Sequence, residues 1–277
     1  MIKYTDILFY IHYSLYKYLD VKKNINFGEK RKAVMNQVLS MLIMALLPVG
    51  VLIYYVYWKD KGKPEPVWQL VKAFLLGTLT VFLSLAISMP LSVVGFIPLE
   101  VNSIWESFRI SFFGAAFPEE IAKFAILWLV LRKNSWFDEK MDGIVYAVCV
   151  SMGFAAFENV LYVFQNGDEY LSVALMRAAT ALPGHFCFGI LMGYYYSLAR
   201  FYPYGRGRNM FLTLAVPILV HGIYDMVLFS LGVVSSPVVQ VILAVVFIVF
   251  CVKLWKRGSF SIKEHLARDA DDVMLNN

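Results

Sequence analysis

Long apolar runs separated by short polar connections make up most of this chain. A helix needs about 20 apolar residues to cross a bilayer, and roughly seven runs are long enough. The pattern therefore predicts an all-α, polytopic transmembrane helix bundle with about seven to eight spans. The expected spans are residues 36–57, 67–97, 104–131, 142–164, 171–199, 210–231 and 236–253.

The composition agrees with a membrane protein. Of the 277 residues, 60% are hydrophobic and 16% are charged, and the mean hydropathy is +0.63. Soluble domains are about 25% charged, so little of this chain remains for a separate soluble domain. We expect a basic N-terminal segment over 1–35, either interfacial or a partly ordered tail, a transmembrane domain over 36–255, and a soluble C-terminal tail over 256–277.

The net charge of +5 is distributed over the connections and tails. This is typical of a membrane-orientation signal, so membrane lipids are expected partners and nucleic acid is not. Lys and Arg lie in alternate connections, which places these connections and the C-terminus in the cytoplasm. The basic N-terminal segment then lies outside, unless residues 7–19 form an extra element, and the sequence leaves both open. The basic positions are Lys59, Lys61, Lys63, Arg132, Lys133, Lys140, Arg200, Arg206, Arg208, Lys253, Lys256 and Arg257.

Ionisable side chains also lie inside the expected spans, where each costs about 2.5–3.5 kcal/mol to insert. Two adjacent carboxylates, Glu119 and Glu120, lie near the middle of the span 104–131. Counting from the span ends places ionisable residues of three other spans in the same layer, about 10 Å thick. Residues of this kind are candidates for a functional site. They are Glu158, His185, His221 and Asp225.

Local spacing indicates that these side chains share one site. Lys123 follows Glu119 by four residues and Asp225 follows His221 by four, so each pair lies on one helix face. Asn159 stands beside the acid Glu158 as a hydrogen-bond partner. Prolines lie close to several of these residues, and kinked membrane helices need neighbours or water for the freed carbonyls. A hydrated pocket near mid-membrane is therefore expected. The prolines are Pro118, Pro183 and Pro217.

Other unusual positions have simpler explanations. Glu106, Arg109 and Arg177 lie near the outer ends of their expected spans, where such side chains snorkel or pair. Gly189 and Gly193 are spaced as small residues that allow two helices to pack closely.

Four sequence elements, each in a separate apolar segment, resemble the PrsW family of intramembrane proteases. The likeness runs in order from roughly residue 44 to residue 255. It implies a protease domain over 36–255, in a bacterial cell membrane, that acts on a single-span membrane protein such as a membrane-bound anti-sigma factor. The elements are Glu119-Glu120-x-x-Lys123; Asp142-Gly-Ile-Val-Tyr with Gly153-Phe-Ala-Ala-Phe-Glu158-Asn159; Pro-Gly-His185-Phe; and His221-Gly-Ile-Tyr-Asp225.

The family is similar to the CAAX prenyl endopeptidases and the bacteriocin-processing membrane proteases, in which a glutamate-activated water attacks the peptide. The resemblance implies that Glu119 and Glu120 are the first-motif glutamates, Glu158 the second-motif acid and His221 the third-motif histidine. CAAX-type enzymes have histidine in place of Glu158 and usually asparagine in place of Asp225. An ionised aspartate cannot donate to an oxyanion, so that role does not carry over.

These residues lead us to expect an intramembrane endopeptidase that cuts a peptide bond in or next to a transmembrane region. Glu119 would deprotonate the attacking water, with Glu120 and Lys123 tuning or positioning it. His221, oriented by Asp225, would stabilise the oxyanion or protonate the leaving amine. Glu158 and His185 would complete the water-binding pocket.

Three alternatives remain open from the sequence. A metal-dependent version would use Glu119, Glu158, His185 and His221 as zinc ligands, although the compact His-Glu-x-x-His signature is missing and no cofactor is expected. A proton-coupled transporter would use the same carboxylates as a relay, but we find no inverted repeats. A non-catalytic scaffold descended from such a protease is the third.

Overall fold

The structure is a computed structural model that describes residues 27–60 and 62–276. Within these residues the chain forms helices and no strand, as the apolar pattern predicts. The expectation of an extra element over residues 7–19 lies outside the described part. The helices are α2 (Phe27–Lys59), α3 (Val67–Val93), α4 (Ile104–Arg109), η1 (Ile110–Ala116), α5 (Phe117–Leu131), α6 (Lys140–Gln165), η2 (Gly167–Glu169), α7 (Tyr170–Ala179), α8 (Ala181–Phe201), α9 (Arg206–Val233) and α10 (Pro237–Asn276).

The described residues contain six helical stretches that are long and apolar enough to cross a membrane. They correspond to α2, α3, α6, α7 with α8, α9 and α10. The remaining expected span, 104–131, is helical throughout but divides into α4, the π-helix η1 and α5. The protein is therefore an integral, multi-pass membrane protein with the all-α fold that the sequence predicts.

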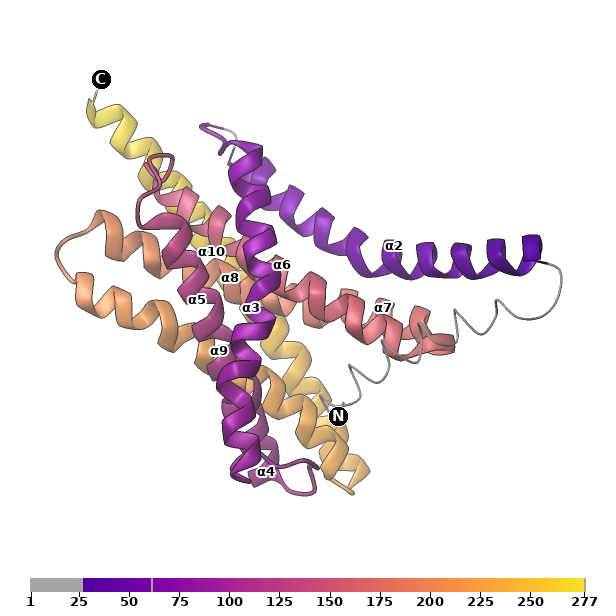
Figure 1. Ribbon diagram of the computed structural model, residues 1–277. Helices are drawn as coiled ribbons and strands as arrows, with labels where there is room; N and C mark the ends of the chain where they lie inside the picture. Colours follow the sequence, from indigo (N-terminus) through magenta and orange to yellow (C-terminus); the bar gives the residue numbers. More distant parts are fainter. Residues whose placement is uncertain (1–26, 61, 277) are drawn as a thin grey trace.

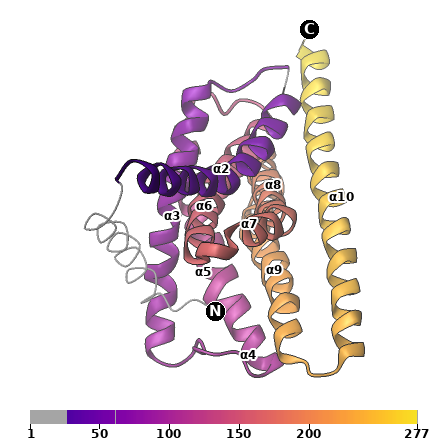
Figure 2. The same cartoon turned by 90° about the vertical axis from the view of Figure 1, so that its right-hand side faces the viewer.

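Helix α6 forms the centre of the bundle and packs against α8, α3 and α2. Figure 2 shows α3 and α10 on opposite sides of the bundle, with α6 and α8 between them. The buried core lies mainly where α6 meets α8, whereas the outward faces of α2 and α10 expose large apolar side chains. An apolar outer surface of this extent suits contact with lipid. Core side chains include Ile144, Val148, Met152, Phe186 and Ile190.

Glycines bring α6 into close contact with its two main neighbours. A Cβ on Gly193 would lie 2.3 Å from the carbonyl oxygen of Gly143, and one on Gly153 would lie 2.2 Å from that of Phe74. A Cβ on Gly189 would lie 2.9 Å from the Ser151 side chain. The expectation that Gly189 and Gly193 serve helix packing is confirmed.

The C-terminal residues do not behave as a fully solvated tail. They continue α10, and one face of this extension packs against α6 and α8, burying Ile262 and His265. The Asp269 carboxylate accepts hydrogen bonds from the backbone N–H groups of Lys140 and Met141, both at 2.9 Å. Asp269 therefore satisfies donors that the first turn of α6 would otherwise leave free. The sequence predicts a separate, solvated tail because residues of both charge signs are mixed there.

We expect Gly193→Ala to lower the free energy of unfolding by about 1–3 kcal/mol, because the added Cβ meets backbone that cannot rotate away. The matched control is Gly50→Ala in α2, where a Cβ meets nothing within 4 Å. That variant should be neutral or more stable, since alanine favours a helix interior by up to about 1 kcal/mol. Unfolding of the purified variants in one detergent measures both, and equal effects would contradict the packing role.

Candidate active site

Helix α5 carries three of the polar residues in its first two turns: Glu119, Glu120 and Lys123. Helix α5 starts at Phe117, directly after the π-helical stretch Ile110–Ala116, and Pro118 lies at this junction, where it offers no backbone N–H to the preceding turn. π-helical turns inside longer helices occur frequently at functional sites. Here the turn sets the direction in which the two glutamates point into the bundle.

Glu120 and Lys123 form the buried centre of the site. The Lys123 Nζ lies 2.8 Å from Glu120 Oε1 and 3.3 Å from Glu119 Oε2, and it lies 4.3 Å from the centroid of the Phe154 ring. The predicted pairing of Glu119 with Lys123 is therefore present, but the closer partner of the lysine is Glu120. Removing either partner would leave an uncompensated buried charge, which is strongly destabilising.

The partners of His185 on α8 fix the position of its ring proton. Its Nδ1 lies 3.2 Å from Lys123 Nζ, and its Nε2 lies 3.2 Å from Glu158 Oε2 on α6. An ammonium group only donates and an ionised carboxylate only accepts. His185 thus accepts at Nδ1 and donates at Nε2, which makes it a neutral imidazole that links the lysine to Glu158.

The imidazole of His221 on α9 lies between two acids. Its Nδ1 is 2.8 Å from Glu120 Oε1, and its Nε2 is 3.2 Å from Asp225 Oδ2. Because ionised carboxylates only accept, two such partners require two N–H groups on the ring, unless one of the acids carries the proton. In both cases His221 and its two acids together carry one proton more than a neutral imidazole with two ionised carboxylates. The ring also stacks on Phe188, with centroids 4.6 Å apart.

The structure adds one residue that the sequence analysis had assigned to the membrane edge. Arg177 on α7 donates from Nη2 to Glu158 Oε2 at 2.8 Å and from Nε to Asn159 Oδ1 at 2.7 Å. The pairing expected for Arg177 is therefore present, but its partners are residues of the site. An acid inside a span, such as Glu158, is expected to pair with a cation. This expectation is the sequence signal that could have identified Arg177 as a site residue.

Asn159 does not bond to the neighbouring acid Glu158. Its side-chain amide donates to the Ala45 carbonyl of α2 at 2.7 Å, and its carbonyl oxygen accepts from Arg177. The residue therefore connects α2 and α7 to the site, and it shares the arginine with Glu158.

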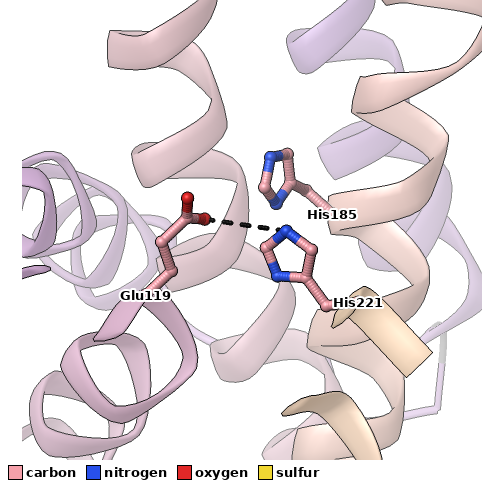
Figure 3. A group of neighbouring side chains, drawn as sticks. All are labelled: Glu119, His185 and His221. Atoms are coloured by element: carbon pink, nitrogen blue, oxygen red, sulfur yellow. Dashed lines mark ion pairs between the residues drawn. The ribbon is translucent and has the colours of Figure 1, made fainter. Parts of the chain in front are cut away.

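The site has a closed side and an open side. Glu120, Lys123, His185 and His221 are buried. In contrast, the side chains of Glu119, Asp225 and Glu158 keep 14%, 19% and 23% of their surface exposed. Figure 3 shows Glu119, His185 and His221 pointing toward one another from α5, α8 and α9, with Glu119 Oε2 at 4.0 Å from His221 Nε2. The three partly exposed carboxylates can therefore be reached from outside the bundle.

The residues expected from the sequence thus come together from separate helices. Glu119, His185 and His221 each offer an atom to a group in which all atoms lie within 4.8 Å of one another, which is close enough to hold a metal ion. Glu158 lies outside this group, on the far ring nitrogen of His185. The four-residue zinc set expected from the sequence is therefore not the set that the structure brings together.

Comparisons with known proteins find matches to one family. A family model described as PrsW family intramembrane metalloprotease matches residues 65–252. A curated "Protease PrsW" of Oceanobacillus iheyensis is 38% identical over 191 residues, which cover 69% of this chain and 83% of that protein. The "Protease PrsW" of Bacillus subtilis is 35% identical over 194 residues, covering 70% and 84% of the two chains. That of Clostridioides difficile is 34% identical over 197 residues, covering 69% and 79%. No solved structure gives a significant match.

We expect Arg177→Met to lower the free energy of unfolding by about 3–5 kcal/mol, because it leaves Glu158 without its permanent cation. The double variant Arg177→Met, Glu158→Gln should recover part of this loss, since it removes the uncompensated charge. Arg208→Met, which changes an exposed arginine, is the matched control. Unfolding of the wild type, Arg177→Met, Glu158→Gln, the double variant and the control in one detergent measures the coupling. A double variant as unstable as the sum of the two single variants would contradict the ion pair.

Proposed function

The chain belongs to the PrsW family of intramembrane proteases, and from this premise we propose that it hydrolyses a peptide bond in or next to the transmembrane region of a single-span membrane protein. One observation carries the proposal: the partly exposed carboxylate of Glu119 lies beside the buried set Glu120, Lys123 and His221. A base that water can reach stands next to groups that hold a proton and a fixed positive charge.

In the proposed reaction, Glu119 accepts a proton from the attacking water, whose oxygen bonds to the carbonyl carbon of the substrate. His221 then gives a proton to the leaving amine, and Glu120 and Asp225 hold its ring in place. Lys123 contacts both glutamates, at 3.3 and 2.8 Å, and its positive charge favours their ionised forms. Glu158 and Arg177 act through His185 and are positioning residues in this proposal.

The site also suits a divalent metal, as the description of the matching family states for its members. Glu119, His185 and His221 would hold the ion, and nitrogen and carboxylate donors of this kind are typical of catalytic zinc. Glu120 on His221 and Glu158 on His185 resemble the outer carboxylates that orient such imidazoles. A bound ion would polarise the carbonyl and make water more acidic. However, Lys123 already contacts Glu119 and His185 Nδ1 and would have to leave both.

The proposed orientation places the C-terminus in the cytoplasm of a bacterial cell. The C-terminus lies at the same end of the bundle as the α2–α3 and α5–α6 connections, which carry basic residues (Figures 1 and 2). The connections at the opposite end, 94–103 and 234–236, have no Lys or Arg. A substrate helix would then reach the site from within the lipid. We propose a membrane-bound anti-sigma factor as the substrate class, by resemblance to the family.

A transporter that uses the same carboxylates is less well supported. The acids are tied to Lys123, Arg177 and the two imidazoles, whereas a proton relay needs groups that exchange partners. The family membership also favours the protease.

We expect Glu119→Gln to lower the cleavage rate of a tagged single-span substrate by about 10²–10⁴-fold, the usual contribution of a general base. His221→Ala should have an effect of similar size. Glu100→Gln, which changes an exposed acid in the α3–α4 connection, should cleave like the wild type. Co-expression with each variant and detection of the truncated membrane peptide measures this. Equal cleavage by all four proteins would remove the protease assignment from these residues.

Cleavage by the purified enzyme should survive removal of transition metals, because the Lys123 ammonium already occupies the space between Glu119, Glu120 and His185. The measurement is the cleavage rate after treatment with a chelator such as phenanthroline, with Mg²⁺ kept in the buffer. Loss of activity that added zinc restores would show instead that the metal-dependent version holds.

A further inference from the structure

A second cluster of carboxylates lies at the opposite end of α6 from Glu158. The α2–α3 connection supplies Asp60 and Glu65, the α5–α6 connection supplies Glu139, and the first turn of α6 supplies Asp142. Oxygen atoms of Asp60, Glu139 and Asp142 all lie within 4.8 Å of one another. The Glu65 carboxyl contacts Asp142 and accepts the hydroxyl of Tyr146. This end of the bundle also carries the C-terminus (Figure 2).

Three of these acids are buried, and two of the three have an oxygen without a hydrogen-bond partner among the described residues. Asp60 is 2% exposed and Asp142 is 1% exposed. Asp142 Oδ2 accepts from the backbone N–H groups of Asp138 and Glu139, at 2.9 and 2.7 Å, but its Oδ1 has no partner. Asp60 Oδ2 has none either. Unpartnered carboxylate oxygens are costly to bury, so they require an explanation.

The cations nearby are engaged elsewhere. Within the described part of the chain, Lys63 pairs with Asp138 at 2.6 Å, and Lys140 pairs with Asp269 and Asp272. Burial and the neighbouring acids Glu139 and Glu65 raise the pKa of the Asp60 carboxyl to about 7. The carboxylates of the cluster thus face one another without a compensating positive charge from these lysines.

We propose that Asp60, Glu139 and Asp142, with Glu65 at their edge, bind a hard divalent cation such as Ca²⁺, Mg²⁺ or Mn²⁺. Ligands on opposite sides of a Ca²⁺ ion are about 4.6–5.2 Å apart, since each lies at 2.3–2.6 Å from the metal. The three oxygen atoms, all within 4.8 Å of one another, are therefore close enough to be ligands of one such ion. Mg²⁺ and Mn²⁺ need a slightly tighter arrangement.

The chemistry of the ligands separates this site from the active site. All of its donors are carboxylate oxygens, which suit hard cations, whereas the active site offers two imidazoles and one carboxylate. The bound ion would join the α2–α3 connection to the first turn of α6. Because α6 is the central helix and also carries Glu158, the ion would hold one end of the element on which the active site is built.

The test is a titration of the full-length, chelator-treated protein with MnCl₂, followed by the loss of the electron paramagnetic resonance signal of free Mn²⁺. We expect saturable binding that Ca²⁺ or Mg²⁺ displaces. Asp60→Asn should weaken the Mn²⁺ affinity by about tenfold or more, the usual effect of losing a group from a metal site. Asp168→Asn removes one exposed acid just beyond the other end of α6 and should bind like the wild type.

Further variants distinguish Mn²⁺ binding at this carboxylate cluster from Mn²⁺ binding at the active site. Glu119→Gln should retain Mn²⁺ binding, whereas loss of binding in that variant would place the ion at the active site and overturn the proposal. If Asp60→Asn does not fold, Glu139→Gln replaces it, because glutamine keeps an oxygen that can accept the N-terminal hydrogen bond of α6. No saturable binding by the wild type, or equal binding by the wild type and the cluster variants, would also overturn the proposal.

Discussion

The burial of charge inside an apolar bundle is the constraint on which this structure depends. Lys123 is enclosed among Glu119, Glu120 and His185. The two carboxylates compensate its positive charge, and the imidazole nitrogen of His185 accepts a hydrogen bond from it. None of these side chains would be stable alone at this depth, since an unpaired charge there costs several kcal/mol. Their mutual pairing therefore requires that α5, α8 and α9 meet at one place. The site and the helix packing are two consequences of the same requirement.

The irregular parts of the helices lie where this meeting occurs. The π-helical stretch Ile110–Ala116 ends just before Pro118 and Glu119. The helix is interrupted at Thr180, which lies between Arg177 and His185 in the sequence. A straight helix would present these side chains at other angles. Gly222, beside His221, allows close contact with the π-helical stretch, because a Cβ there would lie 2.5 Å from the Phe112 ring. Local departures from the regular helix thus position the polar groups.

Much of this arrangement was predictable from the sequence. Apolar runs of membrane-crossing length indicate the bundle, and acids and imidazoles at one depth indicate a shared site, because both follow from the cost of inserting polar groups in lipid. The pairing of Glu119 with Lys123 follows from helical spacing. These inferences depend on distance along one helix or on depth alone.

The remaining features depend on how helices are rotated and packed against one another, which spacing along the chain does not determine. The contact between Glu120 and His221 joins residues 101 positions apart. Arg177 on α7 reaches Glu158 on α6, a contact between residues 19 positions apart. Similarly, the mixture of both charge signs after residue 255 indicated a solvated tail, although one face of α10 packs against α6 and α8.

A double-mutant cycle on peptide cleavage tests most directly whether the buried groups act as one unit. The cleavage rate is measured for the wild type, Glu120→Gln, His221→Gln and the double variant, with the amount of folded enzyme held equal. If two groups act as one unit, the first substitution removes most of their joint contribution to the cleavage rate, and the second substitution adds little. We predict that the double variant is no slower than about the slower of the two single variants. Losses that multiply would contradict a shared network, and would mean that Glu120 and His221 contribute independently.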